Sequence, residues 1–121
     1  MSITRAKQSL KAKLQTRRYN TYAADRNQGS AIVTVNGHPL DPRCDLCNHS
    51  PTGFEWGYFG SGPAQLALAI LAFEYGDDVA MEFYYDFKCR FIATRGGETW
   101  TITSAELDRG MNNLLAEGKK S

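Results

Sequence analysis

The chain has 121 residues, of which 42% are hydrophobic, 22% charged and 12% aromatic. This length predicts one domain, and the ordinary composition excludes collagen-like, low-complexity and fully disordered chains. The net charge of +1 conceals an uneven distribution, because residues 1–24 carry six basic and no acidic side chains, whereas the remaining residues carry eight basic and thirteen acidic ones.

Membrane and export signals are not expected from the sequence. The longest apolar run, residues 64–73, is about half as long as a helix that crosses a bilayer. No hydrophobic signal segment follows Met1, and three cysteines form an odd set that does not suit a disulfide framework. We therefore expect a cytoplasmic protein.

The N-terminal residues are expected to form a basic helix over residues 3–19, with a narrow apolar stripe. We divide the chain into a basic helical arm, residues 1–24, and a single α+β domain, residues 25–121. The arm either contacts nucleic acid or an acidic protein surface, or docks on the acidic remainder of its own chain. The basic side chains that carry this prediction are Arg5, Lys7, Lys11, Lys13, Arg17 and Arg18.

Two β-hairpins are expected in the domain. Residues 31–35 alternate β-branched side chains, and the Asn36-Gly37 dipeptide predicts a tight turn into a short return strand at residues 38–40. Residues 91–94 and 100–103, separated by the Gly96-Gly97 pair, predict the second hairpin.

Three further helices are expected. Residues 63–75, with Gly62 as the N-cap, have almost no polar face, which is typical of a buried helix. Residues 79–90 form the next helix, with Phe83, Phe87 and either Met81 or Tyr84 on its apolar side. A capping box from Thr103 to Glu106 begins the last helix. The fold class is α+β: two short hairpins, forming a small antiparallel sheet, pack around the buried central helix, with a basic N-terminal helix and a C-terminal helix.

Residues 49–71 read HSPTGFEWGYFGSGPAQLALAIL. This string resembles the hallmark of a small family of unknown function found in bacteria, phages and other mobile elements. The resemblance continues more loosely over residues 31–107, and it does not include the basic helix, Cys44 or Cys47. It implies no activity. What it implies is a setting, namely a small accessory protein of a phage or mobile element in the cytoplasm of a bacterial host.

The glycine-rich segment before the central helix is the first candidate site. Free amides at a helix start, the helix dipole and the Ser61 hydroxyl favour an anion, as in phosphate-binding loops. Neighbouring aromatic rings suit stacking on a base. Alternatively, the glycines allow close packing and the aromatic rings belong to the core. We predict a recognition surface for a host protein or a phosphate-bearing nucleotide, formed by His49, Ser50, Glu55, Trp56, Tyr58, Gly60, Ser61, Gly62 and Gln65.

Two chemical alternatives use the same region. Ser61, His49 and Glu55 are the residue types of a hydrolytic triad, but the G-x-S-x-G elbow is missing. Cys44, Cys47 and His49, with His38, are zinc-ligand types, but no second Cys or His pair follows at the usual spacing, so we assign no metal and no cofactor.

The preferred function is a non-enzymatic binding protein that sequesters or occludes its partner, as an inhibitor of host defence would. Nucleic-acid association through the basic arm and a small hydrolase are the alternatives. A homo-oligomer formed through the basic helix or an open hairpin edge is also possible.

Overall fold

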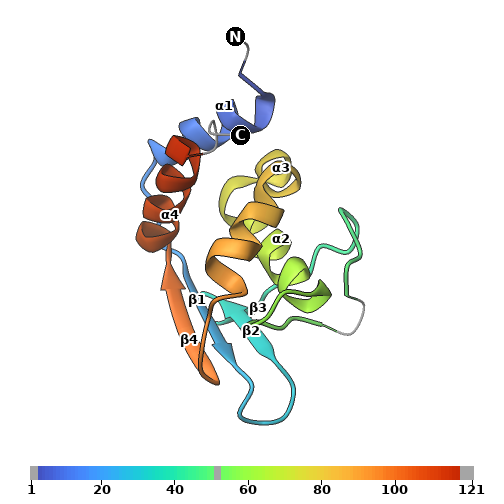
Figure 1. Cartoon of the computed structure of the whole chain (residues 1–121). Helices are drawn as coiled ribbons and strands as arrows, with labels where there is room; N and C mark the ends of the chain where they lie inside the picture. The colour runs from blue at the N-terminus through green and yellow to red at the C-terminus, as the bar shows by residue number, and fades with distance from the viewer. Residues whose placement is uncertain (1–2, 51–52, 118–121) are drawn as a thin grey trace.

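The computed structural model describes residues 3–50 and 53–117 (Figure 1). In this part of the chain, four helices and an antiparallel sheet of four strands form an α+β fold, as the sequence predicts. The elements are α1 (Arg5–Leu14), β1 (Thr21–Asp25), β2 (Ile32–Val35), β3 (His38–Pro39), α2 (Ser61–Tyr75), α3 (Asp77–Phe87), the π-helical turn η1 (Lys88–Ile92), β4 (Thr99–Thr103) and α4 (Ser104–Glu117). None of the described helices is both long and apolar enough to span a bilayer.

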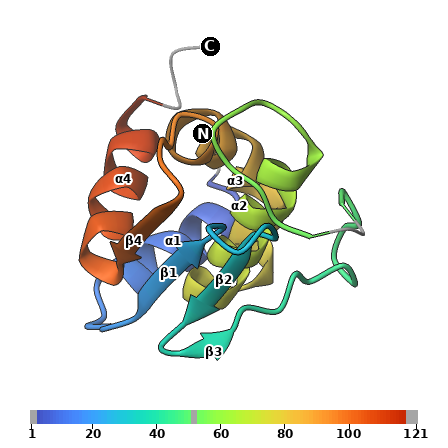
Figure 2. The same cartoon turned by 90° about the horizontal axis from the view of Figure 1, so that it is seen from below.

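The sheet has the strand order β3-β2-β1-β4, with every neighbouring pair antiparallel (Figure 2). The first predicted hairpin is confirmed: Asn36 and Gly37 connect β2 to β3 with φ angles of 53° and 83°, as a tight turn requires. The second predicted hairpin is wrong. β4 pairs with β1, so that Tyr22 lies opposite Ile102, whereas residues 91 and 92 belong to η1.

The N-terminal helix is shorter than the predicted 3–19. Thr4 caps it by accepting a hydrogen bond from the Lys7 amide at 3.1 Å, and the helix ends at Leu14. Beyond that residue, the Thr16 hydroxyl and the Arg18 guanidinium both donate to the Lys13 carbonyl, which satisfies a helix-end acceptor while the chain turns away. Residues 21–25 then form β1, so the boundary expected after residue 24 falls inside a strand of the sheet.

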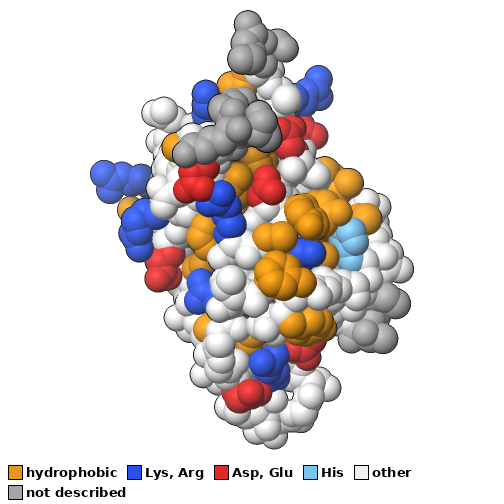
Figure 3. All heavy atoms as spheres, in the orientation of Figure 1, with side chains coloured by type: hydrophobic (Ala, Val, Ile, Leu, Met, Phe, Trp, Pro, Cys, Tyr) orange, Lys and Arg blue, Asp and Glu red, His pale blue; other side chains and the backbone are white. Residues whose placement is uncertain are grey.

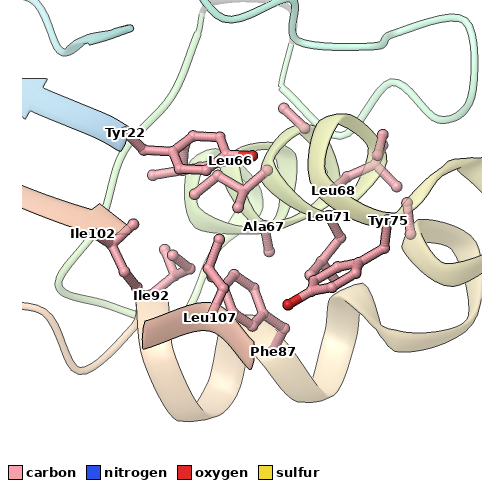
Figure 4. Close-up of a cluster of buried hydrophobic side chains, with 14 of the residues drawn as sticks. Tyr22, Leu66, Ala67, Leu68, Leu71, Tyr75, Phe87, Ile92, Ile102 and Leu107 are labelled. Carbon is pink, nitrogen blue, oxygen red and sulfur yellow. The ribbon is translucent and has the colours of Figure 1, made fainter. Parts of the chain in front are cut away.

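The central helix α2 is buried on nearly all sides, as its sequence predicts. It begins at Ser61 with Gly60 as the N-cap, so the predicted start at Pro63 with Gly62 as the cap is wrong. Pro63 lies within the first turn, where backbone amides have no partner in the helix and a proline is tolerated. Figure 4 shows its side chains meeting residues from the sheet, α3, η1 and α4; the labelled ones are Tyr22, Leu66, Ala67, Leu68, Leu71, Tyr75, Phe87, Ile92, Ile102 and Leu107.

Helix α3 ends in a wider turn. The Ala93 amide donates to the Lys88 carbonyl at 2.8 Å, which is the five-residue spacing of a π-helix. The capping box that begins α4 is confirmed, because the Thr103 amide donates to the Glu106 carboxylate at 2.9 Å and the Glu106 amide donates to the Thr103 hydroxyl at 3.3 Å.

Candidate functional site

Gln65 anchors the loop that precedes the glycine-rich segment. Its side-chain carbonyl accepts hydrogen bonds from the amides of His49 and Ser50 at 2.7 and 3.0 Å. Its side-chain amide donates to the carbonyls of Pro42 and Cys47 at 2.6 and 3.1 Å. All hydrogen-bonding capacity of this wholly buried side chain is therefore directed at the protein's own backbone. We remove Gln65 from the predicted recognition surface.

Trp56 and Gly62 are also internal, which corrects their assignment to the recognition surface. Trp56 is only 1% exposed, its indole N–H donates to the Gly97 carbonyl at 3.0 Å, and its ring packs edge-on against Trp100. A β-carbon added at Gly62 would lie 2.8 Å from the β-carbon of Glu55. Gly62 is thus required for close packing, which is the alternative that the sequence left open.

Glu55 is half-buried beside the start of α2 and is paired within the chain. Its carboxylate accepts a hydrogen bond from the Arg26 guanidinium at 2.5 Å, and the same guanidinium lies 4.4 Å from the centre of the Trp56 ring. The backbone nitrogen and β-carbon of Glu55 pack against Gly62, so protein atoms already cover this side of the first turn of α2. Ser61 is exposed at that turn, and Gly60 is half-buried beside the ring of Tyr58.

Tyr58 and Phe59 are the large side chains of the glycine-rich segment that face solvent, with exposed fractions of 49% and 67%. The amide of Gly57 donates to the Ile92 carbonyl at 3.0 Å, so the backbone of the segment is joined to η1 just before these two residues. Figure 2 shows the segment arching beside the end of α3. The glycine-rich segment thereby adjoins the π-helical turn in which α3 ends.

The solvent-facing side of α3 is unusually apolar. Met81, Tyr84, Tyr85 and Lys88 recur at the spacing i, i+3, i+4 and i+7, which places them on one helix face. Met81 is 45% exposed and Tyr85 60% exposed. Figure 3 shows hydrophobic side chains gathered over α3 and the segment before α2, with a basic side chain among them and a histidine at their edge.

We call this region the aromatic surface, and define it by Tyr58, Phe59, Met81, Tyr84 and Tyr85. The predicted recognition surface contained Tyr58 but not Phe59, and it contained none of the three members on α3. The signal that would have found them is a second apolar stripe on α3, opposite the buried one that contains Phe83 and Phe87.

Two nitrogen-bearing side chains border the aromatic surface. The ammonium of Lys88 lies 4.5 Å from the centre of the Tyr85 ring, and the side chain is mostly buried. His49 packs against Tyr84 with ring centres 4.8 Å apart, and its buried Nε2 has no hydrogen-bond partner in the described part of the chain. The charge on neighbouring Cys89 raises the pKa of Tyr85.

The hydrolytic and metal alternatives can be compared with this geometry. His49 packs on Tyr84, and Glu55 pairs with Arg26; within residues 3–50 and 53–117, no hydrogen bond joins either of them to Ser61. Over the same residues, no three His, Cys, Asp or Glu side chains cluster closely enough to hold a metal ion. Cys44, Cys47 and Cys89 are free thiols.

The basic residues of the predicted arm separate into two groups. Arg18 is engaged inside the protein: it pairs with Glu74, whose side chain is fully buried, and its guanidinium donates to Asp108 at 2.7 Å. The other basic side chains lie on or after α1 and form no ion pair in the described residues; they are Arg5, Lys7, Lys11, Lys13 and Arg17. Ala6 and Leu10 pack α1 against the core. Docking of the arm on its own chain was the alternative to nucleic-acid binding in the sequence analysis.

Arg18 belongs to a closed polar cluster. The Tyr22 hydroxyl donates to Glu74 at 2.7 Å, and the Tyr75 hydroxyl donates to Asp108 at 2.6 Å. Burial, followed by these hydrogen bonds to carboxylates, raises the pKa of both phenols far above the ordinary value. Because each group already has a partner, the cluster serves to hold the arm, the sheet and α4 together.

Comparison with protein families matches residues 22–113 to a family of unknown function, DUF6166. The matched segment includes the glycine-rich segment, all of α3 and the sheet except Thr21, and it begins after α1. Comparisons with curated proteins and with solved structures give no match.

Proposed function

The chain belongs to the DUF6166 family, whose function is unknown, and we propose that it is a non-enzymatic binding protein whose aromatic surface docks another protein. One observation carries the proposal. Four large apolar side chains from two adjoining segments, Tyr58, Phe59, Met81 and Tyr85, each expose between 45% and 67% of their surface.

Large exposed apolar patches promote aggregation unless they form an interaction site. Contiguous apolar patches are rare on monomers and mark sites of interaction. Tyrosine, phenylalanine and methionine are enriched at the centres of protein interfaces, because their large rigid or adaptable side chains bury much area for little loss of conformational freedom. The aromatic surface has this composition.

A protein partner fits the region better than a phosphate-bearing nucleotide. The backbone and β-carbon of Glu55 pack against Gly62 at the start of α2, and the side chain of Gln65 is already bonded to backbone. The ring expected to stack on a base, Trp56, is in the core. The side chains that are exposed are instead large and apolar, which suits a protein surface more than a small anion.

The setting is part of the proposal. The hallmark string at residues 49–71 supports a small accessory protein of a phage or mobile element, acting in the bacterial cytoplasm. Such a protein would inhibit a host defence component by covering it, without changing it chemically. This step rests on the resemblance alone. The oligomeric state stays a prediction, and the open edge of β4 is one place where two copies would meet.

The test is quantitative capture from a bacterial lysate with the full-length chain as bait. We expect at least one protein to be retained by the wild type and lost with the double variant Phe59→Ser/Tyr85→Ser. The matched control is Tyr19→Ser, which removes a tyrosine that is 80% exposed outside the aromatic surface. Equal retention by all three baits would contradict the proposal.

Nucleic-acid association is a second candidate, because five basic side chains on or near α1 form no ion pair within the described residues. Fluorescence anisotropy with a labelled oligonucleotide tests it. If α1 contacts phosphates, binding falls steeply with salt and is lost in Lys11→Glu/Lys13→Glu. Salt-independent binding would exclude this function for the arm.

A further inference from the structure

The ammonium group of Lys88 has no acidic partner among the residues that the structure describes. The residue is only 9% exposed, and among the described residues its ammonium forms neither a hydrogen bond nor an ion pair. The ammonium nitrogen instead lies 4.5 Å from the centre of the Tyr85 ring. A buried cation that is compensated only by an aromatic ring retains most of its capacity to attract an anion.

The acidic side chains of α3 do not supply that anion. Glu82 accepts a hydrogen bond from the Thr4 hydroxyl at 3.2 Å, which places it toward α1. Asp86 lies two positions before Lys88, on a different side of the helix, in a hollow shared with Lys7 and Leu114. At the start of α3, Asp77 is paired with Arg43 at 2.9 Å, and Asp78 lines a hollow shared with Arg5 of α1.

A ring nitrogen of His49 is a second polar atom without a partner near this face. The buried Nε2 of His49 has no hydrogen-bond partner in residues 3–50 and 53–117, and the His49 ring packs on Tyr84, one helical turn before Lys88. Buried polar atoms in native proteins nearly always have partners, so an unpartnered one is uncommon. Lys88 and His49 therefore flank Tyr84 with unused polar capacity.

We propose that the aromatic surface recognises an acidic segment of its protein partner, in which an Asp or Glu carboxylate binds Lys88 while a neighbouring apolar side chain packs on Tyr85 and Phe59. This inference rests on the proposed function and adds the chemistry of the partner. The carboxylate replaces the missing counter-charge of Lys88 in a region that binding removes from water, where such a pair is strongest.

The experiment is selection of random twelve-residue peptides, displayed on phage, against the immobilised full-length protein. Peptides selected by the wild type should contain Asp or Glu next to an aromatic or aliphatic residue. Lys88→Met keeps the aliphatic stem and removes the charge, so it should lose the acidic preference but keep the apolar one. Lys88→Arg should retain both preferences, and Lys11→Met is the matched control for loss of an exposed lysine.

Measured peptide affinities show how much the Lys88 charge contributes to binding. A selected acidic peptide should bind Lys88→Met about tenfold or more weakly than the wild type, as expected for a lost charged hydrogen bond. Replacement of its acid by Gln should weaken binding to the wild type by a similar factor and have little effect on binding to Lys88→Met.

The possible results separate this inference from the proposed function. Apolar peptides without acidic residues, or an acidic preference that survives in Lys88→Met, would overturn the role of Lys88 and leave the docking surface intact. If no selected peptide depends on Tyr85 or Phe59 for binding, the result would contradict both the role of Lys88 and the proposed function. Preferential, Lys88-dependent binding of a labelled oligonucleotide instead of peptides would overturn the assignment to a protein carboxylate.

Discussion

Arg18 and Glu74, 56 residues apart in the sequence, form an ion pair in which the Glu74 side chain is completely buried. The same carboxylate accepts hydrogen bonds from Asn20 and Tyr22 at 3.1 and 2.7 Å. The pair fixes the segment between α1 and β1 against the end of α2, so a residue of the basic arm is part of the folded core.

Removal of Arg18 should therefore destabilise the protein strongly. In Arg18→Met, Glu74 stays buried without its cation, and the free energy of unfolding should fall by about 3–5 kcal/mol. Urea denaturation followed by circular dichroism measures the change. Arg17→Met is the control, because Arg17 is exposed, and it should alter stability by no more than about 0.5 kcal/mol. Equal effects of the two substitutions would contradict the role of the pair.

The same cluster makes stability depend on alkaline pH. Tyr22 and Tyr75 have pKa values raised above the ordinary 10.0, since burial and carboxylate partners favour the neutral phenol. Their contribution is complete below pH 10 and declines as the pH rises above it, because the unfolded chain releases these protons first. Chemical denaturation at several pH values from about 8 to about 11 should show this decline.

The double variant Tyr22→Phe/Tyr75→Phe is the control for the pH dependence. It should be less stable at neutral pH by about 1 kcal/mol for each lost hydrogen bond, and its stability should fall less steeply at alkaline pH. A parallel pH profile in both proteins would show that other groups cause the decline.

Gln65 should hold the loop at residues 42–50 in place. In Gln65→Leu, two amides and two carbonyls lose their partner, and each buried group left unpaired costs about 1–3 kcal/mol. We expect lower stability and faster hydrogen exchange at the His49 and Ser50 amides, measured by NMR. Gln8→Leu, at an exposed position of α1, should leave the exchange of both amides unchanged.

Gly62 should be intolerant of any side chain. An added β-carbon would lie 2.8 Å from that of Glu55, which cannot move away easily, so Gly62→Ala should destabilise by about 1–3 kcal/mol. Gly96→Ala is the matched control, because nothing lies within 4 Å of its added β-carbon, and its effect should not exceed about 1 kcal/mol. Thermal unfolding compares the two. An undisturbed Gly62→Ala protein would show that the segment is more loosely packed than described.

The aromatic surface should contribute to binding and not to folding. Tyr85→Ser removes a ring that is 60% exposed, so stability should change by no more than about 0.5–1 kcal/mol. Capture of the partner should be lost in this variant. If Tyr85→Ser unfolds the protein, the ring is a structural element and the functional interpretation of this face is wrong.

The sequence predicts the elements whose local signals agree with their final environment. The apolar α2, the Asn36-Gly37 hairpin and the Thr103-to-Glu106 capping box all belong to this group. Strand β1 was missed because Ala23, Ala24 and Asp25 are poor strand formers, and pairing with β2 and β4 stabilises them as a strand. Phe91 and Ile92 form a short apolar run that suits a buried helix end as well as a strand.

The sequence predicted the candidate site only in part, because it does not show which aromatic rings are buried by contacts with distant residues. Tyr58 and Trp56 were both assigned to the predicted recognition surface, but Tyr58 is 49% exposed whereas Trp56 lies in the core. Sequence alone does not distinguish these rings, because burial is decided by the contacts of Trp56 with Trp100 and Gly97. The contribution of α3 depends on Gly57 meeting Ile92, a contact between segments 35 residues apart.

Oxidative footprinting of the free protein and of its captured complex tests the central claim most directly. The account predicts that Tyr58, Phe59, Met81 and Tyr85 become protected together in the complex, while Tyr19 and Phe73, which are exposed elsewhere, keep their reactivity. Protection confined to other residues, with these four side chains as reactive as in the free protein, would contradict it.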